Sequence, residues 1–267
     1  DSRLRASALK AIYDFSEIQT YAFDFAFEIA SQNPLRALTI AKNLCRIVPG
    51  AVLSKHFQEV LQLSDGANRS VRVKSIQIIA VAIQHMPVES AVTAFQLFSS
   101  KLPEAPGDLV EATTEIFQSV VQKFANTDIS ILKTHFPAIL HSLLLLLTIG
   151  DENNNDLIEK TILYGLCACI KEINIPEDQD PAAYLTTFDG TTIQAIVLQF
   201  TTMLGVQFIA IWPHVYKFLE TLPALLRRTT YLFLEVPLRS SLEKMTNPEA
   251  RSLDMVSRFV YSCANEM

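Results

Sequence analysis

Histidine is the residue type of this chain best suited to acid–base catalysis or metal binding, and its spacing favours neither. None of the histidines forms a metal-binding arrangement with another histidine or with a carboxylate. His141 lies in a very apolar segment, where a hydrogen-bonded core or interface histidine is more common than a catalytic one. We therefore expect neither a metal site nor a catalytic histidine at the five positions His56, His85, His135, His141 and His214.

The cysteines lie inside apolar helical patterns and lack the paired spacing of a zinc site. Cys167 and Cys169 are two positions apart and project in different directions from a helix, so they cannot bind one metal ion without unwinding it. With Cys45 and Cys263 they are expected to be buried, reduced thiols of an intracellular protein.

Other catalytic or nucleotide-binding motifs are also missing from the sequence. The glycines occur singly at helix ends, so neither a phosphate-binding loop nor a dinucleotide fingerprint can form. The acidic run at 177–180 lacks the glycine and the terminal glutamate of a calcium-binding EF-hand. The sequence predicts a protein with no enzymatic activity, cofactor or small-molecule substrate. A hydrolase hidden in a helical fold is the enzymatic alternative, and no nucleophile, base and orienting group stand at a plausible spacing for it.

Two basic clusters are the candidate contacts for RNA or for an acidic partner. The first is Arg69, Arg72 and Lys74 at a helix start, and the second is Arg227 and Arg228 near a helix end. Each cluster also has a structural interpretation: the Arg227 pair would complement a helix dipole or bridge to acidic neighbours, and Arg72 would tie neighbouring repeats together. Aromatic residues for base stacking are not interleaved with them, so sequence-specific readout of single strands is not expected.

Composition predicts one large apolar core. The chain of 267 residues is 49% hydrophobic and 19% charged, and no linker-like stretch divides it. We therefore expect residues 1–267 to form a single continuous unit. The net charge of −6 excludes a surface that is basic throughout, so any RNA contact is expected to be local.

Helix start and stop signals recur along the chain. Asn33 and Pro34 place a capping side chain before a proline at the first helical position, and similar punctuation predicts about a dozen helices. The segment 71–78 alternates in part like a strand, but a lone strand among helices would leave its backbone unpaired, so helix is preferred. The predicted helices span 34–48, 51–63, 69–85, 89–102, 108–125, 129–132, 137–149, 156–173, 192–204, 206–222, 224–234, 238–244 and 248–264.

Helix pairs of this kind predict an all-α fold and, within it, an α-solenoid of antiparallel pairs of HEAT or armadillo type. Polar turns at 65–72 and 150–157 precede long apolar helices, as in HEAT repeats, and Asp65 with Arg72 is the expected inter-repeat pair. About five to seven pairs are expected from repeats of roughly 40 residues. A non-repeating helical domain is the alternative.

No membrane contact is expected. The longest apolar run, 139–149, is shorter than the about 20 residues of a membrane-spanning helix, and the chain opens without a signal-peptide pattern. Asp1 stands in place of an initiator methionine and the helical pattern continues to Met267, so we expect a fragment of a longer protein.

Several segments resemble one family, the HEAT-repeat ribosome-biogenesis factors related to ribosomal RNA-processing protein twelve. The resemblance is carried by the aromatic stretch around Trp212, the only tryptophan, and by the motif that contains Pro237 and Leu238. Leu222 and Pro223 depart from the family, which places a small-residue turn there. The resembling segments are 43–57, 204–208, 210–222, 236–245 and 252–267.

The resemblance implies a nuclear and nucleolar scaffold that shuttles to the cytoplasm on pre-ribosomal particles. Such a scaffold would assist processing of the small-subunit precursor RNA and subunit export by binding RNA and assembly factors. Trp212 would be a packing residue between neighbouring helix pairs. An importin- or exportin-like nuclear transport receptor, or another HEAT-repeat interaction scaffold, is the alternative.

Overall fold

The fold is all-α across the part of the chain that the structure describes. This structure is a computed structural model, and it describes residues 15–222 apart from 31, 103–108, 151, 172, 174–180 and 205, together with Ser257 and Tyr261. These residues form helices and turns and no strand, which confirms the predicted class. Contacts divide the chain into two compact units, Asp1–Thr127 and Asp128–Met267. That residues 1–267 form one continuous solenoid segment stays a prediction.

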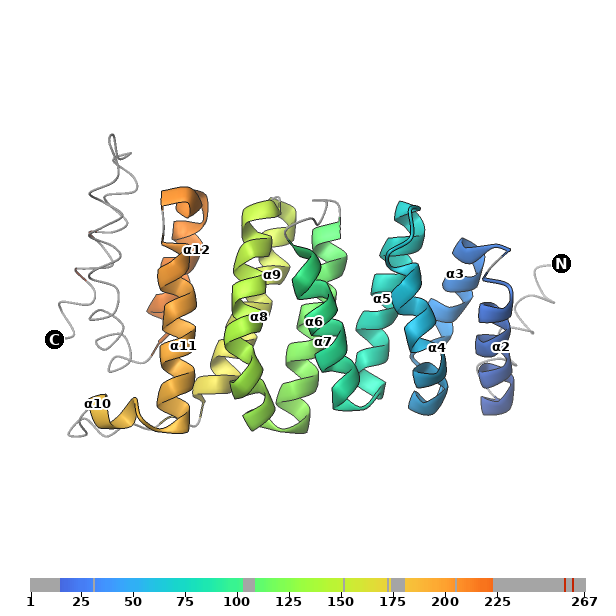
Figure 1. The fold of residues 1–267 in the computed structure, drawn as a ribbon, viewed down its shortest axis with the longest axis horizontal. Coiled ribbons are helices and arrows are strands. Elements are labelled where there is room, and N and C mark those ends of the chain that lie inside the picture. The colour runs from blue at the N-terminus through green and yellow to red at the C-terminus, as the bar shows by residue number, and fades with distance from the viewer. Residues whose placement is uncertain are drawn as a thin grey trace. The chain divides into compact units, whose positions relative to one another are not determined.

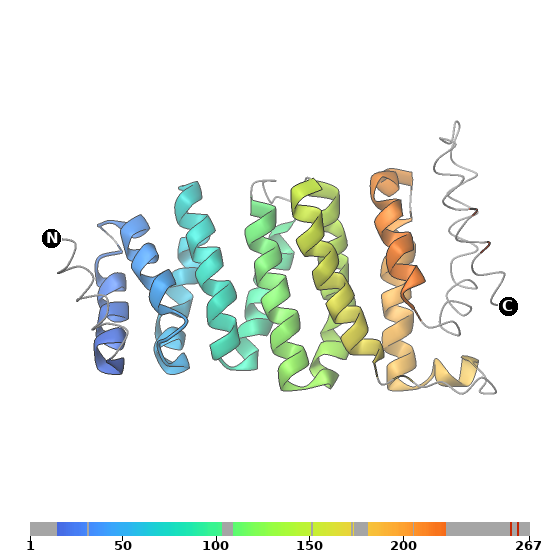
Figure 2. The ribbon, with the colours of Figure 1, turned by 180° about the vertical axis from the view of Figure 1, so that it is seen from behind.

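In the first unit, helices that follow one another in sequence pack together, and so do alternate helices (Figure 1). Helix α2 contacts α3, α4 contacts α5, and α6 contacts α7; in addition α3, α5 and α7 contact one another in that order. Figure 2 shows these last three side by side. The helices are α2 (Ser16–Glu28), α3 (Pro34–Leu44), α4 (Gly50–Leu63), α5 (Arg69–His85), α6 (Val88–Lys101) and α7 (Val110–Thr127).

Side-chain caps set the starts of α3 and α5. Asn33 Oδ1 accepts a hydrogen bond from the Arg36 backbone N–H at 3.2 Å, directly before Pro34, as predicted. Asn68 Oδ1 accepts from the Val71 N–H at 3.2 Å, so the ambiguous segment 71–78 is helical. Helix α2 was not predicted, because neither a capping side chain nor a proline marks its start at Ser16.

Helix α5 is the centre of the first unit, since it contacts α3, α4, α6 and α7. Ile76, Ile79 and Ile83 are at most 1% exposed. Burying each of these side chains contributes about 1.5–3 kcal/mol. Gln77, Val81 and Gln84 lie on the remaining part of the helix surface and are half-buried.

The second unit is built around one long apolar helix, α8 (Ile129–Ile149), which contacts α9 and α11. Two helices were predicted here, with Pro137 starting the second, but α8 runs through Pro137 without a break. Proline inside a helix costs about 3 kcal/mol. Phe136, Ile139 and Leu140 flank it and are fully buried, which offsets that cost. The other elements are α9 (Glu152–Ile170), α10 (Pro181–Tyr184), α11 (Phe188–Met203), the 3₁₀-helix η3 (Val206–Ile211) and α12 (Trp212–Glu220).

Because it is continuous, α8 has the length and apolar composition of a membrane-spanning helix, which the shorter predicted run lacked. Half of its most apolar 18-residue window is buried inside the protein. Its Lys133 is buried and pairs with Asp189 of α11 at 2.5 Å. A core helix of a helical protein has these same properties, so the pattern is weak evidence for a membrane span.

The stretch around Trp212 contains two helices where a single helix over 206–222 was predicted. Helix η3 ends at Ile211 and α12 begins at Trp212, with Pro213 in its first turn. Proline lacks an N–H and its ring clashes with the carbonyl four residues earlier, so an α-helix cannot continue through it without strain. Trp212 is fully buried, as its predicted packing role requires. The helices predicted at 224–234 and 238–244 lie in the part that the structure does not describe. Of the one predicted at 248–264 it describes only Ser257 and Tyr261, both helical.

Candidate functional site

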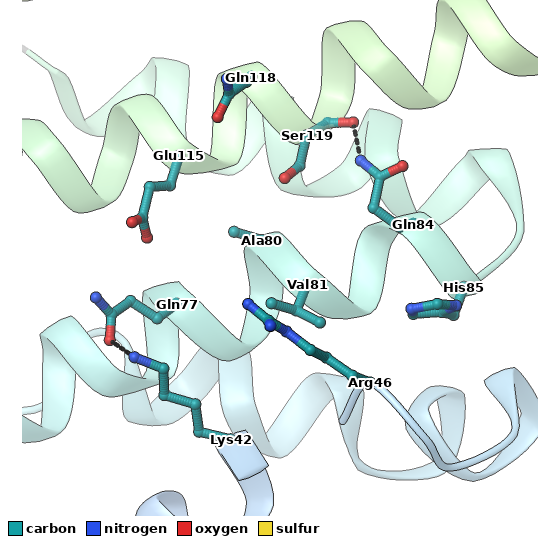
Figure 3. A pocket seen from close by; sticks show the side chains of 10 residues that line it. All are labelled: Lys42, Arg46, Gln77, Ala80, Val81, Gln84, His85, Glu115, Gln118 and Ser119. Atoms are coloured by element: carbon teal, nitrogen blue, oxygen red, sulfur yellow. Dashed lines mark hydrogen bonds between the residues drawn. The ribbon is translucent and has the colours of Figure 1, made fainter. Parts of the chain in front are cut away.

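A polar groove on the first unit is a candidate site within the described residues (Figure 3). It has a volume of about 510 Å³ and lies over α5 between α3 and α7. Ala80 and Val81 of α5 form its centre. The other lining residues are polar or charged: Lys42, Arg46, Gln77, Gln84, His85, Glu115, Gln118 and Ser119.

Two hydrogen bonds across the groove fix the orientation of its amides. The Lys42 ammonium donates to Gln77 Oε1 at 2.5 Å, and Gln84 Nε2 donates to the Ser119 backbone carbonyl at 2.7 Å. The Gln77 NH₂ group and Gln84 Oε1 take no part in these two bonds, so each can still form a hydrogen bond with another group. Within the described residues, neither these two groups nor the Gln118 amide has a hydrogen-bond partner.

Charge is distributed unequally between the two walls of the groove. Lys42 and Arg46 come from the α3 side, and Arg46 is exposed and forms no ion pair with any described residue. Glu115 comes from α7. Burial raises the pKa of the Glu115 carboxyl, the nearby Glu111 raises it further, and Lys42 lowers it. One wall therefore attracts anions, and the opposite wall presents a hydrogen-bond acceptor.

The predicted basic cluster Arg69, Arg72 and Lys74 lies on α5, and none of the three lines the groove. Arg69 is exposed, whereas Arg72 and Lys74 are half-buried. Arg227 and Arg228 lie outside the described residues. Whether these residues contact RNA or a partner stays a prediction.

The expected pair between Asp65 and Arg72 does not form. Asp65 instead pairs with Lys101 of α6, and Arg72 Nε is buried without a hydrogen-bond partner among the described residues. The turn before α5 orients Asp65 toward the following helix pair, where Lys101 is in reach. The acidic turn residue Asp65 is therefore paired, but with a different cation from the predicted one.

An acidic cluster around His56 was missed from the sequence. His56 of α4 lies 2.6 Å from Asp24 of α2 through Nε2 and 3.5 Å from Glu59 through Nδ1, and its ring stacks on Phe27. Lys55 also pairs with Asp24 at 3.0 Å. The hydrogen bond from His56 lowers the pKa of Asp24. Glu59 is three residues from His56, a local spacing that was overlooked in the sequence, whereas Asp24 is 32 residues away and gave no local signal. The cluster joins two helices and has no nucleophile beside it, so we interpret it as structural.

A second cluster in the other unit joins α9 to α12. Glu159 accepts hydrogen bonds from His214 and from Lys217, which stand on one face of α12. Burial opposes ionisation of Glu159, yet these two donors hold its pKa below its ordinary value. His214 also lines a cavity of about 550 Å³ with Asn155, whose Oδ1 is buried without a partner in the described part.

The remaining chemistry-bearing residues lie where they have no evident role. Burial raises the pKa of Cys45 to about 11 and that of Cys169 to about 12, as expected for inert thiols. Cys167 is exposed, contrary to the expectation of burial, because it lies two residues from Cys169 and so on another face of α9. His141 Nδ1 is buried and lacks a partner among the described residues, so His141 is not the fully hydrogen-bonded core histidine that was predicted.

The fold and the groove support one broad class, an all-helical protein with a polar surface site. In the described ranges, no three or more His, Cys, Asp or Glu side chains could hold a metal ion together. Comparison of the chain with protein-family models, with curated proteins and with solved structures finds no match.

Proposed function

We propose that this chain is a segment of an α-solenoid that acts as a non-enzymatic binding scaffold. The observation that carries the proposal is the similar sequence separation, between 31 and 39 residues, of the side-chain bonds that join helices of the first unit. Lys42 and Gln77 are 35 residues apart, Gln84 and Ser119 are also 35 apart, and Asp65 and Lys101 are 36 apart.

The helix starts follow the same spacing. Helices α3, α5 and α7 begin at Pro34, Arg69 and Val110, so this row of helices repeats after roughly 40 residues. Short connections between successive helices favour antiparallel pairs. Stacked pairs of this length are the building units of HEAT and armadillo solenoids, whose neighbouring helices form extended binding surfaces.

We propose pre-ribosomal particles as the partner of this scaffold, with a nuclear and nucleolar location. The support is the resemblance around Trp212, a stretch whose tryptophan is fully buried and therefore consistent with a packing role. The scaffold would bind small-subunit precursor RNA and assembly factors, and so assist RNA processing and subunit export. Arg69, Arg72, Lys74, Arg227 and Arg228 would supply local RNA contacts.

The test is affinity purification of the tagged protein from cells that produce it, followed by measurement of small-subunit precursor RNA. We expect enrichment of the precursor, and a loss of direct RNA contact as salt is raised from about 50 to 200 mM, because phosphate binding releases counterions. Recovery of the protein free of precursor particles, with no nucleolar signal, would reject the proposal.

A nuclear transport receptor is the second candidate, because it would share both a solenoid and the net charge of −6. The two differ in their response to the small GTPase Ran. A direct interaction with Ran that depends on the bound nucleotide would favour the receptor, and its absence alongside precursor enrichment would favour the assembly scaffold.

A further inference from the structure

We propose that the groove over α5 binds an extended peptide segment of a partner protein, with an acidic side chain of that segment placed beside Arg46. The inference rests on the proposed scaffold function and names what one face of the scaffold would bind. Three features of the groove carry it: free amide groups, a suitable length, and opposite charge on its two walls.

The amide groups match the main chain of a peptide. An extended backbone offers alternating N–H donors and carbonyl acceptors that no secondary structure of its own occupies. Gln84 Oε1 can accept from such an N–H, and the Gln77 NH₂ group can donate to such a carbonyl. Gln118 can do both. Ala80 is small, so the peptide backbone can approach the floor of the groove closely.

The length of the groove suits a short extended segment. Packed helices lie about 8–10 Å apart, so the path from α3 across α5 to α7 covers about 16–20 Å. An extended chain rises about 3.3 Å per residue, and five or six residues would therefore cross the groove. Five or six residues in a helix would span only about 9 Å, and their backbone groups would bond to one another and not to the glutamines.

The charges set the direction and the chemistry of the segment. Arg46 is exposed and unpaired within the described residues. The Lys42 ammonium is hydrogen-bonded to the neutral Gln77 and interacts with the Glu115 charge, so Arg46 is the cation that leaves the α3 wall with uncompensated positive charge. A carboxylate next to Arg46 can form a bidentate, charge-assisted pair. On the α7 wall Glu115 would accept a main-chain N–H or a hydroxyl and would repel a second acidic side chain.

RNA fits the same groove less well. Two cations face one carboxylate, so a phosphate backbone crossing the groove would meet repulsion at Glu115. Apart from the His85 imidazole, the lining has no aromatic side chain on which a base could stack. RNA binding is therefore an outcome that the experiment must be able to detect.

The experiment measures binding of fluorescein-labelled probes to the 267-residue chain by fluorescence anisotropy. The probes are a ten-residue serine peptide that contains one Glu (the Glu–Ser peptide), the same peptide with Lys in place of that Glu, and a ten-nucleotide oligouridylate. We expect the Glu–Ser peptide to bind and the other two to bind at least about tenfold more weakly, which corresponds to about 1.4 kcal/mol.

Matched variants locate the binding site. Arg46→Glu should weaken Glu–Ser peptide binding at least about tenfold, whereas Arg36→Glu, the same charge reversal at an exposed position of α3 outside the groove, should change it less than about twofold. Gln77→Ala should weaken it about threefold or more. Glu115→Gln should tighten it about threefold, a gain that partial unfolding could not produce.

Three results would overturn the inference: no Glu–Ser peptide binding, equal losses in Arg46→Glu and Arg36→Glu, or oligouridylate binding that Arg46→Glu alone abolishes. These results leave the scaffold proposal open, because that proposal depends on recovery of precursor RNA with the intact protein. Conversely, peptide binding without precursor RNA would retain the groove assignment and reject the pre-ribosomal partner.

Discussion

Gly165 lies inside α9, not at a helix end as expected from the sequence, and packs closely against α8, so replacing it with alanine should destabilise the second unit. A Cβ added at Gly165 would lie 2.0, 2.6 and 2.8 Å from three ring atoms of Phe136 on α8. Phe136 is fully buried, so its ring can move away only by displacing the side chains packed around it. Optimal carbon–carbon contact is about 3.5–4.0 Å, so all three contacts would be strongly repulsive.

The net effect of Gly165→Ala is the difference between two opposing contributions. Alanine in a helix interior is about 1 kcal/mol more favourable than glycine. Forcing one extra carbon into a packed core costs about 1–3 kcal/mol, and three overlapping atoms place this site at the upper end of that range. We therefore expect the free energy of unfolding to fall by about 2 kcal/mol.

Trp212 gives a direct assay, because it is the only tryptophan and is fully buried in the same unit as Gly165. Urea unfolding followed by tryptophan fluorescence should show a midpoint about 1 M lower in Gly165→Ala, for a slope of about 2 kcal/mol per M. The control is a double-mutant cycle with Phe136→Leu, which removes the ring. In that background Gly165→Ala should cost at least about 1 kcal/mol less. An unchanged midpoint in Gly165→Ala, or the same loss in both backgrounds, would refute the packing argument.

Further predictions concern one ion pair in each unit and one glycine. Asp24→Asn should destabilise the protein more near pH 7 than near pH 3. The folded pKa of Asp24 is lowered, so its stabilisation is fully present above the ordinary aspartate pKa of about 3.9 and is lost as pH falls through the folded value. Thermal unfolding followed by circular dichroism measures this, and an equal loss at both pH values would contradict it. Asp189→Asn should lower the free energy of unfolding by about 3 kcal/mol, because it leaves the nearly buried Lys133 charge unpaired. Lys133→Met should lower it less, because Asp189 is 40% exposed. Both are measured with the Trp212 assay, and a larger loss in Lys133→Met would contradict the argument. Gly50→Ala should destabilise the protein by about 1–3 kcal/mol, because the new Cβ would lie 2.2 Å from the His85 carbonyl oxygen. In the matched variant Gly66→Ala the nearest contact of the Cβ is 3.2 Å, so the loss should be clearly smaller in the same denaturation experiment.

Local signals predicted most of the helices correctly. Asn33 with Pro34 and Asn68 are short-range start signals, and the helices that follow them begin where expected. Proline was the less reliable signal, because its effect depends on what surrounds it. Pro137 is accommodated inside a deeply buried helix, while Pro213 stands in the first turn of a new one. The two cases differ in the packing around each proline, which a sequence pattern does not reveal.

The groove could not be predicted because its components come from three separate helices. Lys42, Gln77 and Glu115 are unremarkable polar residues in their own segments, and only the packing of α3, α5 and α7 brings them together. The sequence drew attention to clustered charges such as Arg69 to Lys74 instead, which lie near the start of α5 and away from the groove. The similar separation of bonded partners, between 31 and 39 residues, is visible only once the partners are known.

The central claim combines the two proposals, that the protein joins pre-ribosomal particles and that the groove beside Arg46 holds a peptide segment of a protein in those particles. Sedimentation of the tagged protein through a sucrose gradient tests this combination most directly. Wild-type protein and Arg36→Glu should migrate with particles that contain small-subunit precursor RNA, whereas Arg46→Glu should move to the fractions of free protein. Migration of Arg46→Glu with the particles to the same extent as wild type would contradict the claim.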